Sequence, residues 1–191
     1  MPRIRKPPGQ RAEQIAFGLY LNRVEIGRFS FELPLPMLFG RPAGNYQSCI
    51  CHGDLNSNNV MVADNDQIIF IDFQETGRGH VFEDFVTMEA SVRLYHGEES
   101  LNGIQLLAAE QNVREGNDVA GLTGLQRIAA DIRRLAHSNF PAEPFENYYY
   151  ACAAFHLRLL RMKQLTPGQG ERVVAALLAA MGDLARVRRP N

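Results

Sequence analysis

The chain has 191 residues, of which 46% are hydrophobic and 21% are charged, and its formal net charge is -1 at neutral pH. This composition is typical of a globular protein with one well-formed core. A near-neutral charge gives no bulk attraction to nucleic acid, and no apolar run approaches the roughly 20 residues that cross a bilayer. We therefore predict a single domain over 1–191, with no nucleic-acid partner and no membrane partner.

The chain contains 3 cysteines, Cys49, Cys51 and Cys152, and its N-terminus lacks the apolar stretch of a signal peptide. An odd number of cysteines without a signal peptide indicates reduced thiols, so we expect a cytoplasmic protein. Cys49 and Cys51 have no second ligand pair at the spacing of a zinc site, and we expect them to be ordinary strand residues.

The segment before residue 53 yields three expected elements. Residues 1–9 are rich in proline and predict a flexible arm. Apolar residues recur every three or four positions over 10–24, which predicts an amphipathic helix that packs beneath the hairpin expected around 60–71. Residues 28–40 mix aromatic residues with two prolines, a pattern that favours an irregular segment or an edge strand.

Two short β-branched runs, 60–62 and 68–71, enclose the polar residues 63–67. Turn residues between two such runs predict a β-hairpin. Because a hairpin brings the chain back to its starting point, we expect Asn59 and Asp72 to lie side by side at its open end. Asp54 belongs to the loop that enters the same end.

These three side chains offer carboxylate and amide oxygens, which suit Mg²⁺. An Asp five positions before an Asn, with a second Asp after the returning strand, is a spacing used in phosphoryl transfer. We therefore expect Asp54 to accept the proton of an acceptor hydroxyl, and Asn59 and Asp72 to bind metal. We expect His52 to support the loop through hydrogen bonds and Asp84 to cap the helix that begins beside it.

The motif HGDL at 52–55 with Asn59, followed by IDF at 71–73, resembles the catalytic core of the aminoglycoside phosphotransferase and choline kinase group, relatives of the protein kinases. The resemblance covers the catalytic core, 49–90. It implies an α+β, mostly helical fold equivalent to the C-terminal lobe of a kinase-like protein. It also implies ATP and Mg²⁺ as cofactors and a small-molecule hydroxyl acceptor.

The remaining chain predicts a loop followed by helices. Gly77 and Gly79 favour a flexible loop after Asp72. Apolar periodicity and proline breaks predict helices over 83–95, 103–114, 119–138, 145–165 and 170–187. The helical region 100–187 is expected to form the acceptor side of the site, where Glu143 and Glu146 are candidates for binding a cationic acceptor.

One component of phosphotransferase chemistry is missing from the sequence. The chain has two lysines, Lys6 and Lys163, whereas kinase-like transfer uses a lysine and a covering loop from an N-terminal nucleotide lobe. We therefore expect that lobe to be absent and the chain to be inactive by itself. Three hypotheses stay open: a phosphotransferase fragment completed by a partner chain, a non-catalytic binding or scaffold module, and a metal-dependent phosphohydrolase.

Overall fold

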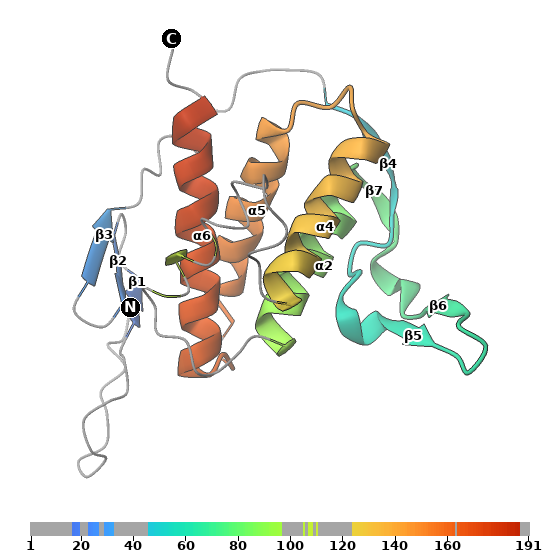
Figure 1. Ribbon diagram of the computed structural model, residues 1–191, viewed down its shortest axis with the longest axis horizontal. Helices are drawn as coiled ribbons and strands as arrows, with labels where there is room; N and C mark the ends of the chain where they lie inside the picture. The colour runs from blue at the N-terminus through green and yellow to red at the C-terminus, as the bar shows by residue number, and fades with distance from the viewer. Residues whose placement is uncertain are drawn as a thin grey trace.

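The computed structural model describes residues 17–19, 23–26, 29–32, 46–96, 105, 107, 108, 110, 124–162 and 164–187. This part of the chain has an α+β, mostly helical fold, as the sequence predicts. Its long helices lie side by side (Figure 1), and they are α2 (Glu83–His96), α4 (Gly124–Asn139), α5 (Glu146–Leu159) and α6 (Pro167–Val187). None of the described helices is long and apolar enough to cross a membrane.

Small antiparallel sheets flank the helices on two sides. Near the N-terminus, β1 (Phe17–Leu19), β2 (Arg23–Ile26) and β3 (Phe29–Glu32) form a three-stranded sheet that contacts α6. On the opposite side of the helices, β4 (Ser48–Cys51) pairs with β7 (Gly77–His80), and β5 (Val60–Val62) pairs with β6 (Ile68–Phe70). Figure 1 shows the β5–β6 hairpin projecting away from the helical body, remote from the three-stranded sheet.

The helix predicted over 10–24 is wrong where the structure describes it, because 17–19 and 23–26 are strands. Polar and apolar residues alternate in the sequence of β2 and again in that of β3, which is the period of a strand. The two-residue separation between these strands is that of a tight hairpin. The three-residue spacing of a few apolar side chains was therefore a coincidence of composition.

The glycine-bearing segment predicted as a flexible loop is instead strand β7, which pairs with β4 over its whole length. Gly79 fits there because it has no side chain. A Cβ atom at that position would lie 2.0 Å from Glu83 Oε2 and 3.0 Å from Cys51 Sγ. The glycine therefore permits close packing rather than loop motion.

The predicted C-terminal helices are present with shifted ends. Of the helix predicted over 103–114, four positions are described, and all four are helical; the arm predicted over 1–9 lies outside the described residues. Helix α6 begins at Pro167, three residues early, because Thr166 and Gln169 form a capping box. The Gln169 N–H donates to Thr166 Oγ1 at 3.3 Å, and the Thr166 N–H donates to Gln169 Oε1 at 3.0 Å.

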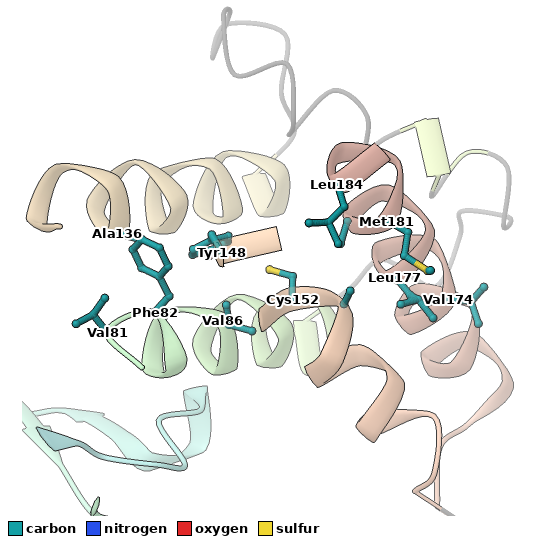
Figure 2. Packing of buried hydrophobic residues seen from close by; sticks show 12 residues of the cluster. Val81, Phe82, Val86, Ala136, Tyr148, Cys152, Val174, Leu177, Met181 and Leu184 are labelled. Carbon is teal, nitrogen blue, oxygen red and sulfur yellow. The ribbon is translucent and has the colours of Figure 1, made fainter. Parts of the chain in front are cut away.

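The hydrophobic core lies between the four helices. Figure 2 shows Phe82 reaching from the start of α2 toward Ala136 of α4, and apolar residues of α6 from Val174 to Leu184 facing the cluster. Small residues such as Ala175, Ala179 and Ala180 are buried along α6. They allow α5 and α6 to pack closely against each other.

A buried charge network joins three of these helices. Glu89 of α2 is 1% exposed and accepts hydrogen bonds from Arg133 of α4 and from the Tyr148 hydroxyl of α5. Arg93 pairs with Glu89 at 2.7 Å and also with Glu110. Burial by itself would raise the pKa of Glu89, but the charges of Arg133 and Arg93 lower it to about 2. The network therefore holds α2, α4 and α5 together through an ionised carboxylate.

Candidate functional site

The predicted hairpin is present and brings the ends of β5 and β6 together. Val60 pairs with Phe70, and just beyond this pair the Ile71 N–H donates to Asn59 O at 3.0 Å. Asp72 therefore leaves the hairpin next to Asn59. Its φ of 61° is in the left-handed region, which aspartate adopts more readily than most residues.

Asp54 is held by the buried side chain of Asn59. The Asn59 Nδ2 group donates to the Asp54 backbone oxygen at 2.8 Å and to Asp54 Oδ2 at 3.1 Å. Asn59 is 8% exposed, so its position is fixed by packing as well as by these bonds. Both bonds use the amide nitrogen, and the amide oxygen is left for another partner.

Asp84 and His52 support the loop that carries Asp54. Asp84 accepts from the backbone N–H of His52 at 2.8 Å and of Gly53 at 3.0 Å. The carboxylate thus satisfies loop amides, whereas the sequence predicted a cap on the amides of its own helix. His52 Nε2 lies 2.8 Å from Ile71 O, and because a carbonyl can only accept, Nε2 carries the proton. His52 therefore ties the loop to the hairpin.

Gly53 is required by the backbone at this point. Its φ is +84°, and a Cβ atom there would lie 2.2 Å from the backbone oxygen of Glu75. A residue with a side chain would be strained and would also collide with the segment after Asp72. The glycine allows the loop carrying Asp54 to approach the segment carrying Asp72.

The donor set fits a hard cation. Asp54, Asn59 and Asp72 present carboxylate and amide oxygens, the ligand types that Mg²⁺ takes in proteins, together with water and phosphate oxygens. In the described part of the chain, no group of three or more His, Cys, Asp or Glu side chains is arranged to hold a metal ion. A cation here would therefore depend on the Asn59 oxygen and on ligands from outside the chain.

Glu143 bonds to other residues of the fold and does not face the loop that carries Asp54. It is buried and accepts from the Gln47 backbone N–H at 2.8 Å and from Asn147 Nδ2 at 2.6 Å, and it contacts His80 Nε2 at 2.9 Å. Burial favours a raised pKa, but these hydrogen bonds and His80 keep the pKa of Glu143 below its usual value. Glu146 lies in the first turn of α5. Neither glutamate lines the pocket beside Asp54.

That pocket has a volume of about 290 Å³ and lies between the loop that carries Asp54, α2 and α5. Its lining combines polar and apolar groups, among them Asp54, Ser91, Leu94, Tyr95, Phe155 and Arg158. Sequence reasoning missed Arg158, because the candidates named for this helical region were Glu143 and Glu146. The signal in the sequence was a basic residue within the largely apolar helix predicted over 145–165, three residues after Phe155.

The β5–β6 hairpin exposes apolar side chains on both of its faces. Val62 is 69% exposed and Ile68 is 59% exposed. Other large apolar side chains of the hairpin and its flanks are also exposed, namely Ile50, Met61, Ile69, Phe70, Ile71 and Phe73. We call this group the apolar hairpin surface. Contiguous exposed apolar surface of this kind marks interaction sites in soluble proteins.

Comparison with known proteins assigns the family. The family model described as ternary complex associated domain 9 matches residues 35–181, which include the loop that carries Asp54, the hairpin, helices α2, α4 and α5, and most of α6. No curated protein and no solved structure matches the chain. No kinase family model matches either, so the predicted membership of the aminoglycoside phosphotransferase and choline kinase group is wrong. That resemblance depended on eight residues, HGDL with Asn59 and IDF, whereas the family match spans most of the sequence. The chain belongs to the ternary complex associated domain 9 family.

Proposed function

We propose that this domain supplies the acceptor-activating half of an ATP-dependent phosphotransferase site, which a partner chain completes. The observation that carries the proposal is the pair of hydrogen bonds from Asn59 Nδ2 to Asp54, at 2.8 and 3.1 Å. They orient the Asp54 carboxylate, which lines a pocket, and they use the nitrogen of the Asn59 amide rather than its oxygen. A proton acceptor and two oxygen ligands at one point are what phosphoryl transfer requires.

The reaction assigns a role to each residue. The acceptor hydroxyl oxygen bonds to the γ-phosphorus of ATP, the bond from that phosphorus to the bridging oxygen breaks, and ADP leaves. The hydroxyl proton passes to the Asp54 carboxylate. Asn59 and Asp72 would hold Mg²⁺, which neutralises charge on the β- and γ-phosphates. Asp84 and His52 keep the loop in place through their bonds to backbone groups.

Two features support completion by a partner chain. The described residues contain no lysine that could pair with the phosphates, so that charge would come from elsewhere. The apolar hairpin surface lies directly beside Asn59 and Asp72, where a second chain could cover both the hairpin and the nucleotide. The family description, ternary complex associated domain, is consistent with a domain that works in an assembly.

A thermal unfolding titration with ATP and Mg²⁺ tests the metal and nucleotide half of the proposal. A ligand at about 100 times its dissociation constant should stabilise the folded chain by roughly 2.7 kcal/mol. We expect a stabilisation that requires Mg²⁺, disappears in Asp72→Asn and persists in Asp64→Asn, a matched change in the exposed hairpin turn. Equal stabilisation of the Asp72→Asn variant, or none in the natural sequence, would contradict the proposal.

The role of Asp54 needs a separate variant. We expect Asp54→Ala to keep the Mg²⁺-dependent stabilisation by ATP, because Asn59 and Asp72 remain. Phosphate transfer by the complete assembly should then fall by about 10²-fold or more, the usual contribution of a general base. Unchanged turnover in this variant would remove Asp54 from the role of proton acceptor.

A second candidate function is that of a non-catalytic binding module within an assembly. The apolar hairpin surface and the family description favour it, and both would be explained without any chemistry. The two candidates differ in one measurement. A binding module shows no Mg²⁺-dependent stabilisation by ATP but loses its association with the assembly when Val62 and Ile68 are made polar.

A further inference from the structure

The pocket beside Asp54 has an uneven charge distribution. Asp54 lines it on the side of the catalytic loop, and Arg158 lines it from the last turn of α5. Arg158 and Asp54 form no ion pair, and the Arg158 guanidinium makes no hydrogen bond or ion pair with any residue that the structure describes. The pocket is therefore lined by one carboxylate and by one guanidinium that has no ion-pair partner among the described residues.

Between the two charges the wall is mainly apolar. Ala90 and Leu94 of α2 face Phe155 and Leu159 of α5, and the Ser91 and Thr87 side chains are occupied by bonds to backbone groups of α2. The volume of about 290 Å³ suits a metabolite-sized molecule and is near the lower limit for ligand pockets. A ligand that fits would have a short hydrocarbon segment between two polar ends.

We propose that this pocket binds a small organic anion that also carries a hydroxyl group. Its carboxylate or phosphate would pair with Arg158, a guanidinium being well suited to bidentate recognition of either group. The hydrocarbon segment would lie against Leu94 and Phe155, and the hydroxyl would face Asp54. The assignment of that hydroxyl as the phosphate acceptor rests on the proposed function, whereas the binding of the anion does not.

The proposal reverses the charge expected of the acceptor. The sequence predicted a cationic acceptor bound by Glu143 and Glu146. Glu143 is instead buried, and its carboxylate bonds to Gln47, Asn147 and His80. Asp54 is the single acidic side chain in the pocket lining, and Arg158 opposes it with a full positive charge. A cationic acceptor would place its charge in the same pocket as the Arg158 guanidinium, and like charges repel each other.

Ligand-observed NMR and calorimetry on the full chain, without nucleotide or Mg²⁺, test the proposal. The probes are 3-hydroxybutyrate and glycerol 3-phosphate as anionic alcohols, choline as a cationic alcohol and glycerol as a neutral one. We expect at least one anionic alcohol to bind more tightly than choline and glycerol. The two anions distinguish carboxylate from phosphate recognition.

The matched variants are Arg158→Gln and Arg161→Gln. Both residues are exposed and basic and lie at the same end of α5, but Arg161 does not line the pocket. We expect about a tenfold or greater loss of anion affinity in Arg158→Gln, the usual effect of losing a charged hydrogen-bond partner, and little change in Arg161→Gln. Binding of none of the probes, tighter binding of choline, or equal losses in the two variants would each overturn the proposal.

The anion-binding test can succeed or fail independently of the test with ATP and Mg²⁺. Asp72→Asn should leave anion binding unchanged, because Asp72 does not line the pocket. Anion binding without any stabilisation by ATP and Mg²⁺ would refute the phosphotransferase proposal and keep this one. Stabilisation by ATP and Mg²⁺ without anion binding would refute the anion-binding proposal and keep the phosphotransferase proposal.

Discussion

The helical core and the β5–β6 hairpin bury their apolar residues to opposite extents. In the core, Val86 is 2% exposed and the polar groups of Glu89 and Tyr148 are bonded to each other. In the hairpin, Val62 is 69% exposed on strand β5, whose three residues are all apolar. The described helices bury the core, whereas the hairpin leaves its apolar surface exposed within the described part of the chain. The difference indicates which part of the sequence serves the fold and which serves an interaction.

The strongest way to disrupt the core is to remove the charge at its centre. Glu89→Gln should lower the free energy of unfolding by about 3–5 kcal/mol, because Arg133 and Arg93 would remain buried without their carboxylate. Urea unfolding followed by circular dichroism measures this loss.

The matched control is Asp131→Asn, which breaks the exposed pair between Asp131 and Arg134. Exposed ion pairs contribute less than about 1 kcal/mol, so this variant should unfold almost as the natural sequence does. Similar losses in the two variants would mean that the Glu89 network does not hold the helices together.

A change of pH tests the core at a second point. His156 is buried in α5, and burial together with Arg93 lowers its pKa from 6.5 to about 4. Between these values the unfolded chain binds a proton that the folded chain does not, so stability must fall as the pH is lowered from about 6.5 to 4. The expected loss is about 3 kcal/mol at pH 4 relative to neutral pH.

His156→Gln isolates this contribution. The variant should show a flatter dependence of unfolding free energy on pH between about 6.5 and 4, even if its stability at neutral pH is lower. The Glu89 carboxylate contributes mainly at lower pH, because its stabilisation is lost between its unfolded pKa of 4.5 and its folded pKa of about 2, and this contribution is the same in the natural sequence and the variant. An unchanged slope in the variant would show that His156 is accessible to protons in the folded protein.

The smallest expected change in the free energy of unfolding is that of a substitution in the hairpin. It tests directly the contrast between exposed apolar residues in the hairpin and buried ones in the core. Val62→Thr should change the free energy of unfolding by less than about 0.5 kcal/mol, because the side chain is already exposed to water. Val86→Thr makes the same chemical change inside α2 and should cost about 1–3 kcal/mol. A substantial loss in Val62→Thr would mean that the hairpin is packed against the rest of this chain in solution.

Local patterns predicted the parts of the site that lie close together in sequence. The hairpin follows from two β-branched runs around a polar turn, and its closure brings Asn59 to Asp72 without help from distant residues. The helix over 83–95 follows from its periodicity and is present as α2. The same reliance on short patterns led to the incorrect helix over 10–24 and to the wrong family, because short motifs recur in unrelated chains.

By itself, the sequence determined the α+β class, the hairpin and the arrangement of Asp54, Asn59 and Asp72, since these depend on turns and on neighbouring residues. Only the tertiary structure decided the rest. It paired β7 with β4, directed Asp84 to the loop amides and placed Glu143 among His80, Gln47 and Asn147. It also brought Arg158 of α5 into the pocket of Asp54, from 104 residues further along the chain. These contacts join segments far apart in sequence, and helix packing fixes them, which no local periodicity encodes.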